Sequence, residues 1–483
     1  MQPRRSSKIL EHSNLVLFPL VNYSLPMRRI VWALSLALCL GILPATAATH
    51  PKPGASCTKL GITKDYKGKK YTCIKSAKKL VWNKGVAIKT AAPNISPTPS
   101  PTPTENWVET DRSLLKDSKV CKISRPAGYD ESIGHYGFPR GANFLPSEGT
   151  LRGLILHVDF ADAKASITTS QNALPYVEEF LKFWTSMSRN KIRFEIDSLN
   201  NWISLPKTAY EYAGEWNHSP QMENYAKEVI FRADSFVDFS KYKIVYIIPV
   251  DSVKRFFQVG PVMSSGNNTY FSSADGPINN LVIGTSPEIS MGGVKWKWLA
   301  HETGHLFGID HPHSYENNDK KLASIFSLMD FGYVAPGLYG IERWIAGWIP
   351  ENQIRCIDGR NQNGFNYIHK ITPLGSSKGD ELISIRLSER RTIIVENRQA
   401  NEFDILPAGY EGLLVYEVDS ARVNGPIKPI LGSRYVIDQS KPEYNGSRVV
   451  GTLRVGESIA FEGIQITVLK KENDSYFVKT ERR

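Results

Sequence analysis

The chain has 483 residues and a formal net charge of +11. Its length exceeds what one hydrophobic core usually supports, which excludes a single small domain and predicts several units. The charge is uneven, because residues 51–90 carry +10, residues 1–50 carry +4 and residues 91–483 carry −3. The basic character therefore belongs to the N-terminal part of the chain.

Residues 1–47 are predicted to be a secretory signal. Met27-Arg28-Arg29 precede an apolar run over 30–43, and Pro44-Ala45-Thr46-Ala47 supplies the small residues of a cleavage site. We expect cleavage after Ala47, with residues 1–26 as an upstream extension. The apolar run is shorter than the roughly 20 residues that cross a bilayer, and no later run is longer. We therefore expect a secreted protein, extracellular or associated with the cell wall.

Four cysteines remain after removal of the signal, an even number in an exported chain, where disulfides are stable. Three pairings are possible. Cys57 and Cys73 lie in one short segment, so a local bridge between them is the simplest choice. That choice leaves Cys121 to close a long loop with Cys356.

Residues 48–90 are predicted to form a lysine-rich disulfide module. Residues 51–90 contain eleven lysines and a single acidic residue, Asp65. Such a module could bind anionic cell-wall polymers or membrane surfaces by screened attraction, or it could be a solvated basic face that aids solubility. Nucleic acid is not an expected partner, because an exported protein would rarely meet it. Residues 91–106 alternate Pro with Ser and Thr, which predicts an extended linker.

Residues 107–355 are predicted to form a domain with a twisted mixed sheet. The expected strands are 154–160, 193–197 and 243–250, and the expected helices are 174–187, 221–237 and 294–307. The last of these helices would lie beneath the sheet. Residues 270–273 and 280–284 are expected to supply an edge strand along which an extended peptide could lie.

The last of these helices ends in a motif, His301-Glu302-Thr303-Gly304-His305-Leu306-Phe307-Gly308-Ile309-Asp310-His311. Residues four apart lie on one helix face, so His301 and His305 can bind one metal ion at about 2.0–2.1 Å. Glu302 need not be a ligand and could act as general base on a water molecule whose pKa zinc lowers toward about 7. Gly308 can adopt positive φ, which ends the helix and turns the chain so that His311 becomes the third ligand.

Neighbouring residues extend this predicted site. Asp310 and His313 compete with His311 for the third position, but the HExxHxxGxxH spacing favours His311. Asp310 could then orient a ligand, and His313 could be a hydrogen-bond donor around the metal or a solvated loop residue. Met329 follows where a Met-turn is expected. Tyr333 could donate a hydrogen bond to a developing oxyanion or simply pack in a turn.

With these motifs the chain resembles the metzincin clan, and within it the immune inhibitor A type family of secreted bacterial metalloproteases. The resemblance consists of short matching patches over roughly residues 150–480. Each patch has low specificity, and their order along the chain is the main support for the resemblance. Many members of the family have an acidic residue at the position of His311. The resemblance implies one catalytic zinc ion and a metzincin-like α/β domain followed by a β-rich unit. The matching patches are Leu154–Asp162, Tyr176–Met187, Trp202–Pro206, Val237–Val250, Leu338–Pro350, Val395–Arg398 and Gly412–Asp419.

Residues 356–483 are predicted to form a β-sandwich-like C-terminal domain. The expected strands are 382–387, 392–395, 413–418, 458–461 and 464–469. This domain could be a platform for a substrate or partner, or a structural cover for the catalytic domain.

We expect a monomeric zinc endopeptidase acting on proteins or peptides, with zinc as its cofactor. The alternative is a cell-envelope-binding protein whose protease domain is vestigial or acts on a non-protein amide, although the intact Glu302 argues against a vestigial site. Cys121 has a rival role as a thiolate that caps the zinc in a latent precursor. Calcium is a possible second metal that scattered acids such as Asp159 and Asp162 do not reveal.

Overall fold

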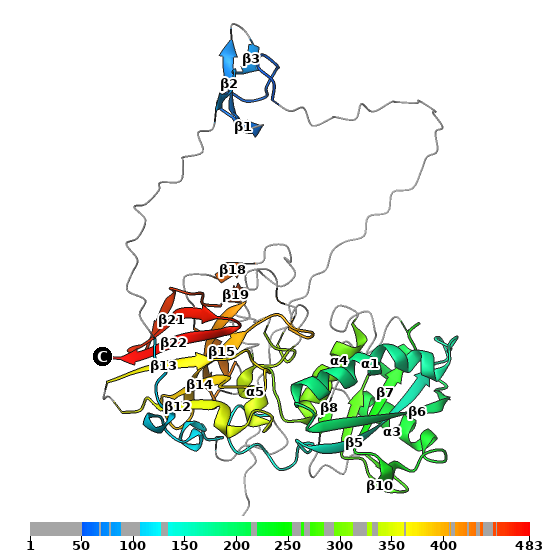
Figure 1. The fold of residues 1–483 in the computed structure, drawn as a ribbon. Coiled ribbons are helices and arrows are strands. Elements are labelled where there is room, and N and C mark those ends of the chain that lie inside the picture. Colours follow the sequence, from blue (N-terminus) through cyan, green and yellow to red (C-terminus); the bar gives the residue numbers. More distant parts are fainter. Residues whose placement is uncertain are drawn as a thin grey trace, which may run out of the picture. The chain divides into compact units, whose positions relative to one another are not determined.

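The chain divides into two compact units, Met1–Thr104 and Glu105–Arg483 (Figure 1). The expected signal over 1–47, the linker over 91–106, His313 and Tyr333 lie outside the residues that the structure describes. Among the helices of the described parts, none is long and apolar enough to cross a membrane. The computed structural model describes residues 51–66, 69–76, 79–87, 107–126, 134–213, 220–253, 262–264, 271–284, 294–312, 326–330, 337–361, 364–404, 406, 411–422, 425–430, 435–437, 448–450 and 452–483.

The first unit contains a small antiparallel sheet in which β2 pairs with each of the other strands. The disulfide Cys57–Cys73 is present, as expected from the sequence. It lies beside a small core formed with Tyr71 and Trp82. The strands are β1 (Thr63–Tyr66), β2 (Lys69–Ser76), β3 (Lys79–Trp82) and β4 (Val86–Ala87).

The second unit contains a five-stranded mixed sheet in the order β6-β5-β7-β11-β8. The first four strands run parallel, and only β8 is antiparallel to its neighbour. The central strands are buried on both faces, as is usual in parallel sheets with helices on each side. The strands are β5 (Gly149–Asp159), β6 (Ile192–Ser204), β7 (Ile244–Pro249), β8 (Val262–Ser264) and β11 (Asn280–Ile283).

Helices cover both faces of this sheet (Figure 1). On one face, α1 (Thr169–Met187) begins with a capping box between Thr168 and Gln171, packs aromatic side chains against the sheet and contacts α4 (Lys295–Leu306). On the other face lie α2 (Ala209–Ala213) and α3 (Pro220–Ala233). The helix expected over 294–307 is therefore present as α4, packed on one face of a mixed sheet.

The prediction that residues 270–273 and 280–284 supply an edge strand is wrong. Residues 280–283 form β11, which lies between β7 and β8 and is not at the edge. The strand on its outer side is β8, over 262–264. The order of the strands along the chain does not indicate this position. Residues 272 and 273 belong instead to a separate hairpin of β9 (Ser272–Ser273) and β10 (Gly276–Pro277).

Two further sheets follow in the C-terminal part of the chain. They pack on each other through one hydrophobic cluster that includes Ile383, Val395, Ile466 and Val478. One has the order β12-β14-β15-β16-β17, with β12 (Ile354–Asp358), β14 (Leu382–Arg386), β15 (Arg391–Arg398), β16 (Gly412–Asp419) and β17 (Ile427–Pro429). The other has the order β13-β22-β21-β20, with β13 (Phe365–Ile371), β20 (Ser458–Phe461), β21 (Ile464–Glu472) and β22 (Ser475–Arg482).

Shorter elements complete the described chain. The helix α5 (Gly340–Ile345) precedes β12, and β18 (Tyr435–Ile437) pairs with β19 (Arg448–Val450). The 3-10 helices are Arg112–Leu114, Ser118–Cys121, Phe239–Lys241 and Glu351–Gln353.

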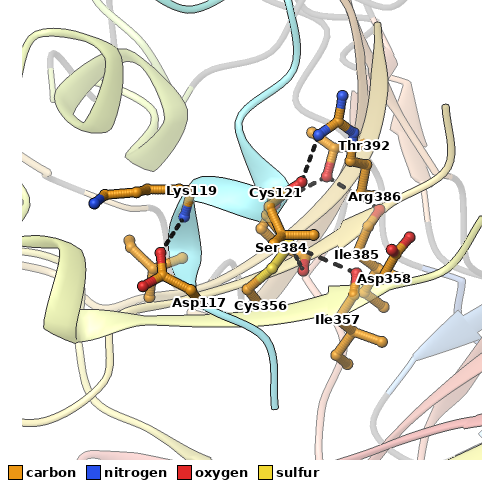
Figure 2. The surroundings of a disulfide bond; sticks show 12 residues. Asp117, Lys119, Cys121, Cys356, Ile357, Asp358, Ser384, Ile385, Arg386 and Thr392 are labelled. Atoms are coloured by element: carbon orange, nitrogen blue, oxygen red, sulfur yellow. Dashed lines mark hydrogen bonds between the residues drawn. A yellow bond between two sulfur atoms is a disulfide. The ribbon is translucent and has the colours of Figure 1, made fainter. Parts of the chain in front are cut away.

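The segment over 107–126 lies against the C-terminal sheets. Its Thr110 amide donates to the Ile368 carbonyl over 2.8 Å, and Cys121 forms the expected disulfide with Cys356 of β12 (Figure 2). This bond leaves no free thiolate at Cys121 for a latent precursor. Both disulfides are typical of chains that fold outside the cytoplasm. The expected domain boundary between 355 and 356 falls inside β12, and the division into two domains stays a prediction.

Candidate metal centre

Three histidines meet at the end of α4. The ligand atoms of His301, His305 and His311 all lie within 4.8 Å of one another. The Nε2 atoms of His301 and His311 are 3.1 Å apart. Two ligands at about 2.0–2.1 Å from a tetrahedral ion lie roughly 3.3 Å from each other, so the spacing fits one ion. These three residues could hold a metal.

Backbone carbonyls orient the two helical histidines. Nδ1 of His301 donates to the Leu328 carbonyl over 2.8 Å, and Nδ1 of His305 donates to the Ile309 carbonyl over 2.9 Å. A proton on Nδ1 leaves a lone pair on Nε2 of each ring. Metal-binding histidines usually have this second hydrogen bond, which sets the tautomer and the ring direction.

The turn that brings His311 to the site depends on Gly308. The helix ends at Leu306, and Gly308 has a φ of +79°, the conformation expected from the sequence. A Cβ at this position would lie 2.6 Å from Cδ2 of Phe144. Glycine is therefore required twice, for its backbone conformation and for the close approach of an aromatic ring.

Asp310 acts on this turn and on His311. Its Oδ1 accepts a hydrogen bond from the His311 amide over 2.7 Å and lies 3.7 Å from the His311 Nδ1. The carboxylate thus faces the ring nitrogen opposite the one that points to His301. This position is consistent with the orienting role expected for Asp310, and His311 is the residue of this turn that lies with His301 and His305.

Glu302 follows the first histidine and is buried within α4. Burial raises the pKa of this carboxyl well above its ordinary value, and the Trp298 indole partly opposes that effect. A cation held by the histidines would lower the pKa again, because it favours the carboxylate. The protonation of Glu302 should therefore depend on whether a cation is bound.

Met329 packs directly under the motif. It is fully buried, and a Cβ on Gly304 would lie 2.4 Å from its sulfur atom. Gly304 stands between the two helical histidines, so the methionine fills the space behind the ligand pair. The Met-turn role of Met329 stays a prediction, and this contact is consistent with it.

Other titratable residues have different surroundings. His157 contacts Asn172 and Ser198 and is not part of the three-histidine group. The Asp159 carboxylate contacts Lys164 and the Ala165 amide, whereas Asp162 accepts from the Ala209 amide over 2.8 Å. These contacts are to protein groups, and calcium at either aspartate stays a possibility from the sequence. His369 contacts Arg355 and Thr480, also far from the histidine group in sequence.

Sequence reasoning missed the residues that surround the three histidines. The Leu328 and Ile309 carbonyls have no side-chain signature, and Phe144 precedes the motif by more than 150 residues. Glu342 and Tyr136, which contact each other near the site, were also missed. Glu342 accepts from the Tyr339 amide at the start of α5 over 2.7 Å, but tyrosine is not a residue that marks a capping box in a sequence, so this contact had no clear signal. No family model and no curated protein matches this chain.

Proposed function

We propose that this chain is a secreted zinc endopeptidase of metzincin type that resembles the immune inhibitor A family. The observation that carries the proposal is the convergence of His301, His305 and His311 beside the buried Glu302. Gly308 and Met329 support it, because Gly308 has positive φ where the helix ends and the Met329 sulfur packs against Gly304 between the two helical histidines. The mixed sheet with its helices supports a metzincin-like domain, and the two packed C-terminal sheets support a β-sandwich-like unit.

Zinc bound by the three histidines would polarise a peptide carbonyl and make water a stronger nucleophile. Glu302 would accept the proton of the attacking water and then pass it to the leaving amine nitrogen. Burial alone favours the protonated carboxyl, whereas the charge of a bound cation favours the carboxylate, so the metal would keep Glu302 able to accept this proton. The hydrogen bonds to Leu328 and Ile309 would hold the rings of His301 and His305 in place during the reaction.

An extended peptide could align along β8. This strand is antiparallel to β11, lies at the described edge of the sheet and contacts α4. Peptides commonly add a strand to such an edge through main-chain hydrogen bonds. The proposal predicts cleavage of unstructured protein segments more readily than of folded ones.

The test is cleavage of casein by the purified protein, with zinc content measured on every sample. Glu302→Gln should abolish cleavage while retaining one zinc ion, and chelation should abolish cleavage in the wild type. Glu178→Gln is the matched control, because this glutamate is exposed on α1 and pairs with Lys182. A Glu302→Gln protein that cleaves like the wild type refutes the general-base role, and a wild type without zinc refutes the site.

We also propose that the lysine-rich module binds an anionic cell-wall polymer. The module is a separate unit, and its described lysines are exposed, including Lys69, Lys70 and Lys75 on β2. Binding of the full chain to purified anionic wall polymer should weaken steeply with salt. Replacing these three lysines by glutamine should weaken it further. Binding to anionic lipid vesicles alone, or unchanged binding by the variant, would refute this proposal.

A further inference from the structure

We propose that Glu342 is a positioning residue for the histidine site, acting through Tyr136 on His311 and through Ser327 on His301. The inference rests on the proposed function in one respect, that the histidines hold a metal ion. Glu342 lies outside the motif, in α5, and is 1% exposed. Its two carboxyl oxygens each contact a different segment of the site.

One oxygen faces Tyr136. The Tyr136 hydroxyl lies 2.7 Å from Oε1 of Glu342 and 2.7 Å from the Asp310 carbonyl oxygen. Asp310 is the residue before His311 and accepts from its amide. The segment that contains Tyr136 also packs on the turn at Gly308, which precedes His311. A Cβ on Gly134 would lie 2.7 Å from the Gly308 carbonyl oxygen. Glu342 and Tyr136 thus hold the turn that presents the third histidine.

The other oxygen faces Ser327. The Ser327 hydroxyl donates to Oε2 of Glu342 over 2.8 Å and accepts from the Met329 amide over 3.1 Å. Between these two residues lies Leu328, whose carbonyl accepts from Nδ1 of His301. The serine therefore fixes the peptide that sets the tautomer and direction of His301. Because the group is fully buried, no water competes for these bonds.

A proton count shows which form of Glu342 completes the network. A phenol has one proton, yet the Tyr136 hydroxyl faces two acceptors when Glu342 is ionised. A protonated Glu342 donates to the phenol oxygen, which frees the Tyr136 proton for the Asp310 carbonyl. Burial raises the pKa of Glu342 to about 7, against the effect of its hydrogen bonds to Tyr136, Ser327 and Tyr339. Glutamine, like the protonated acid, offers a donor on one side-chain atom and an acceptor on the other, whereas leucine offers neither.

The contrast between glutamine and leucine at position 342 is the basis of the experiment. Zinc affinity is measured by competition with a chromophoric chelator, and the ligand field is read from the visible absorption of the Co²⁺-loaded protein. Glu342→Gln should bind zinc within about twofold of the wild type and give the same Co²⁺ spectrum. Glu342→Leu should bind about 10- to 100-fold more weakly and give an altered spectrum, the range found when groups that orient metal ligands are removed.

Two milder variants test the Tyr136 contact and the Ser327 contact of Glu342 separately. Each removes one hydroxyl group and is less disruptive than Glu342→Leu. Tyr136→Phe should weaken zinc binding through His311, and Ser327→Ala should do so through His301. Glu381→Gln is the control for stability, because Glu381 is equally buried but contacts Arg189 and Gly375 rather than the site. Near-UV circular dichroism and thermal unfolding confirm that each variant is folded.

The outcomes separate this inference from the proposed function. If Tyr136→Phe, Ser327→Ala and any folded Glu342→Leu protein keep wild-type zinc affinity and spectrum, the positioning role is wrong. An equal loss of affinity in Glu381→Gln would also overturn it, because the effect would then follow stability. A wild type that binds zinc but cleaves no protein refutes the peptidase proposal alone, and the affinities still decide the role of Glu342. A wild type that binds neither ion refutes both.

Discussion

Gly304 and the thioether of Met329 occupy one packed contact, in which any Cβ on the glycine would come within 2.4 Å of the sulfur. Gly304→Ala should therefore lower the free energy of unfolding by about 1–3 kcal/mol, as expected for overpacking in a full core. The sign is informative, because alanine in a helix interior normally stabilises by about 1 kcal/mol relative to glycine. Urea unfolding followed by tryptophan fluorescence measures the change.

A double-mutant cycle checks that the cause is this contact. Met329→Ala alone should cost about 2–5 kcal/mol, and the double variant should cost less than the sum of the two single changes. Additive costs would show that Gly304 is needed for some other reason.

Gly308→Ala should be more harmful than the same change at Gly347. Both glycines have positive φ, +79° and +78°, but a Cβ would meet Phe144 at 2.6 Å only at Gly308, whereas it would meet nothing within 4 Å at Gly347. Gly347→Ala should cost about 1–2 kcal/mol for backbone strain alone. Gly308→Ala should cost more and should weaken zinc binding. Equal costs and unchanged zinc affinity would contradict the role of the turn.

His157 should make the metal-free protein sensitive to acid. Burial lowers the pKa of its imidazole to about 4, while an unfolded histidine titrates near 6.5. Neutral His157 therefore contributes stability that is fully present above pH 6.5 and is lost as the pH falls through 4. The loss amounts to at most about 3 kcal/mol. Unfolding free energies measured between pH 4 and 7 in the presence of a chelator should show this slope.

His157→Gln isolates the effect, since glutamine keeps a donor and an acceptor for Ser198 and Asn172 but does not titrate. Its stability should depend less on pH over the same interval. His369 titrates in the same direction in both proteins, so it cancels in the comparison. Parallel pH curves for wild type and variant would show that His157 is not responsible.

The two disulfides should differ in what they stabilise. Cys121 and Cys356 are 235 residues apart, so removing their bond with paired serine substitutions should destabilise the larger unit by about 3–5 kcal/mol. Paired substitution of Cys57 and Cys73, which are 16 residues apart in the other unit, is the control. It should leave the main unfolding transition unchanged, and an equal shift in both proteins would contradict the two-unit description.

Short-range spacing made the metal centre predictable. His301, His305 and Gly308 are related by the geometry of one helix and its end, so their arrangement follows from the local sequence. The supporting groups could not be predicted in this way. Tyr136 and Glu342 are 206 residues apart, and nothing local in either segment indicates that they meet.

Strand order was also beyond local patterns. The segment over 280–284 has the apolar residues of a strand, but its place inside the sheet depends on β8, which pairs on its outer side. The expected strand over 193–197 is in fact the start of β6, which continues to Ser204 through exposed and half-buried positions. Such positions have weak apolar periodicity, so the pattern ends before the strand does.

The covalent bond between Cys121 and Cys356 has a consequence for how this protein could be recombined with others. The segment over 107–126 is linked to the C-terminal sheets, and farther along the chain Gly134 and Tyr136 contact the turn of the third histidine. Any transfer of the histidine site to a new protein must therefore carry the C-terminal sheets with it. The lysine-rich module belongs to a different unit, so replacing or removing it should leave the histidine site and the C-terminal sheets intact.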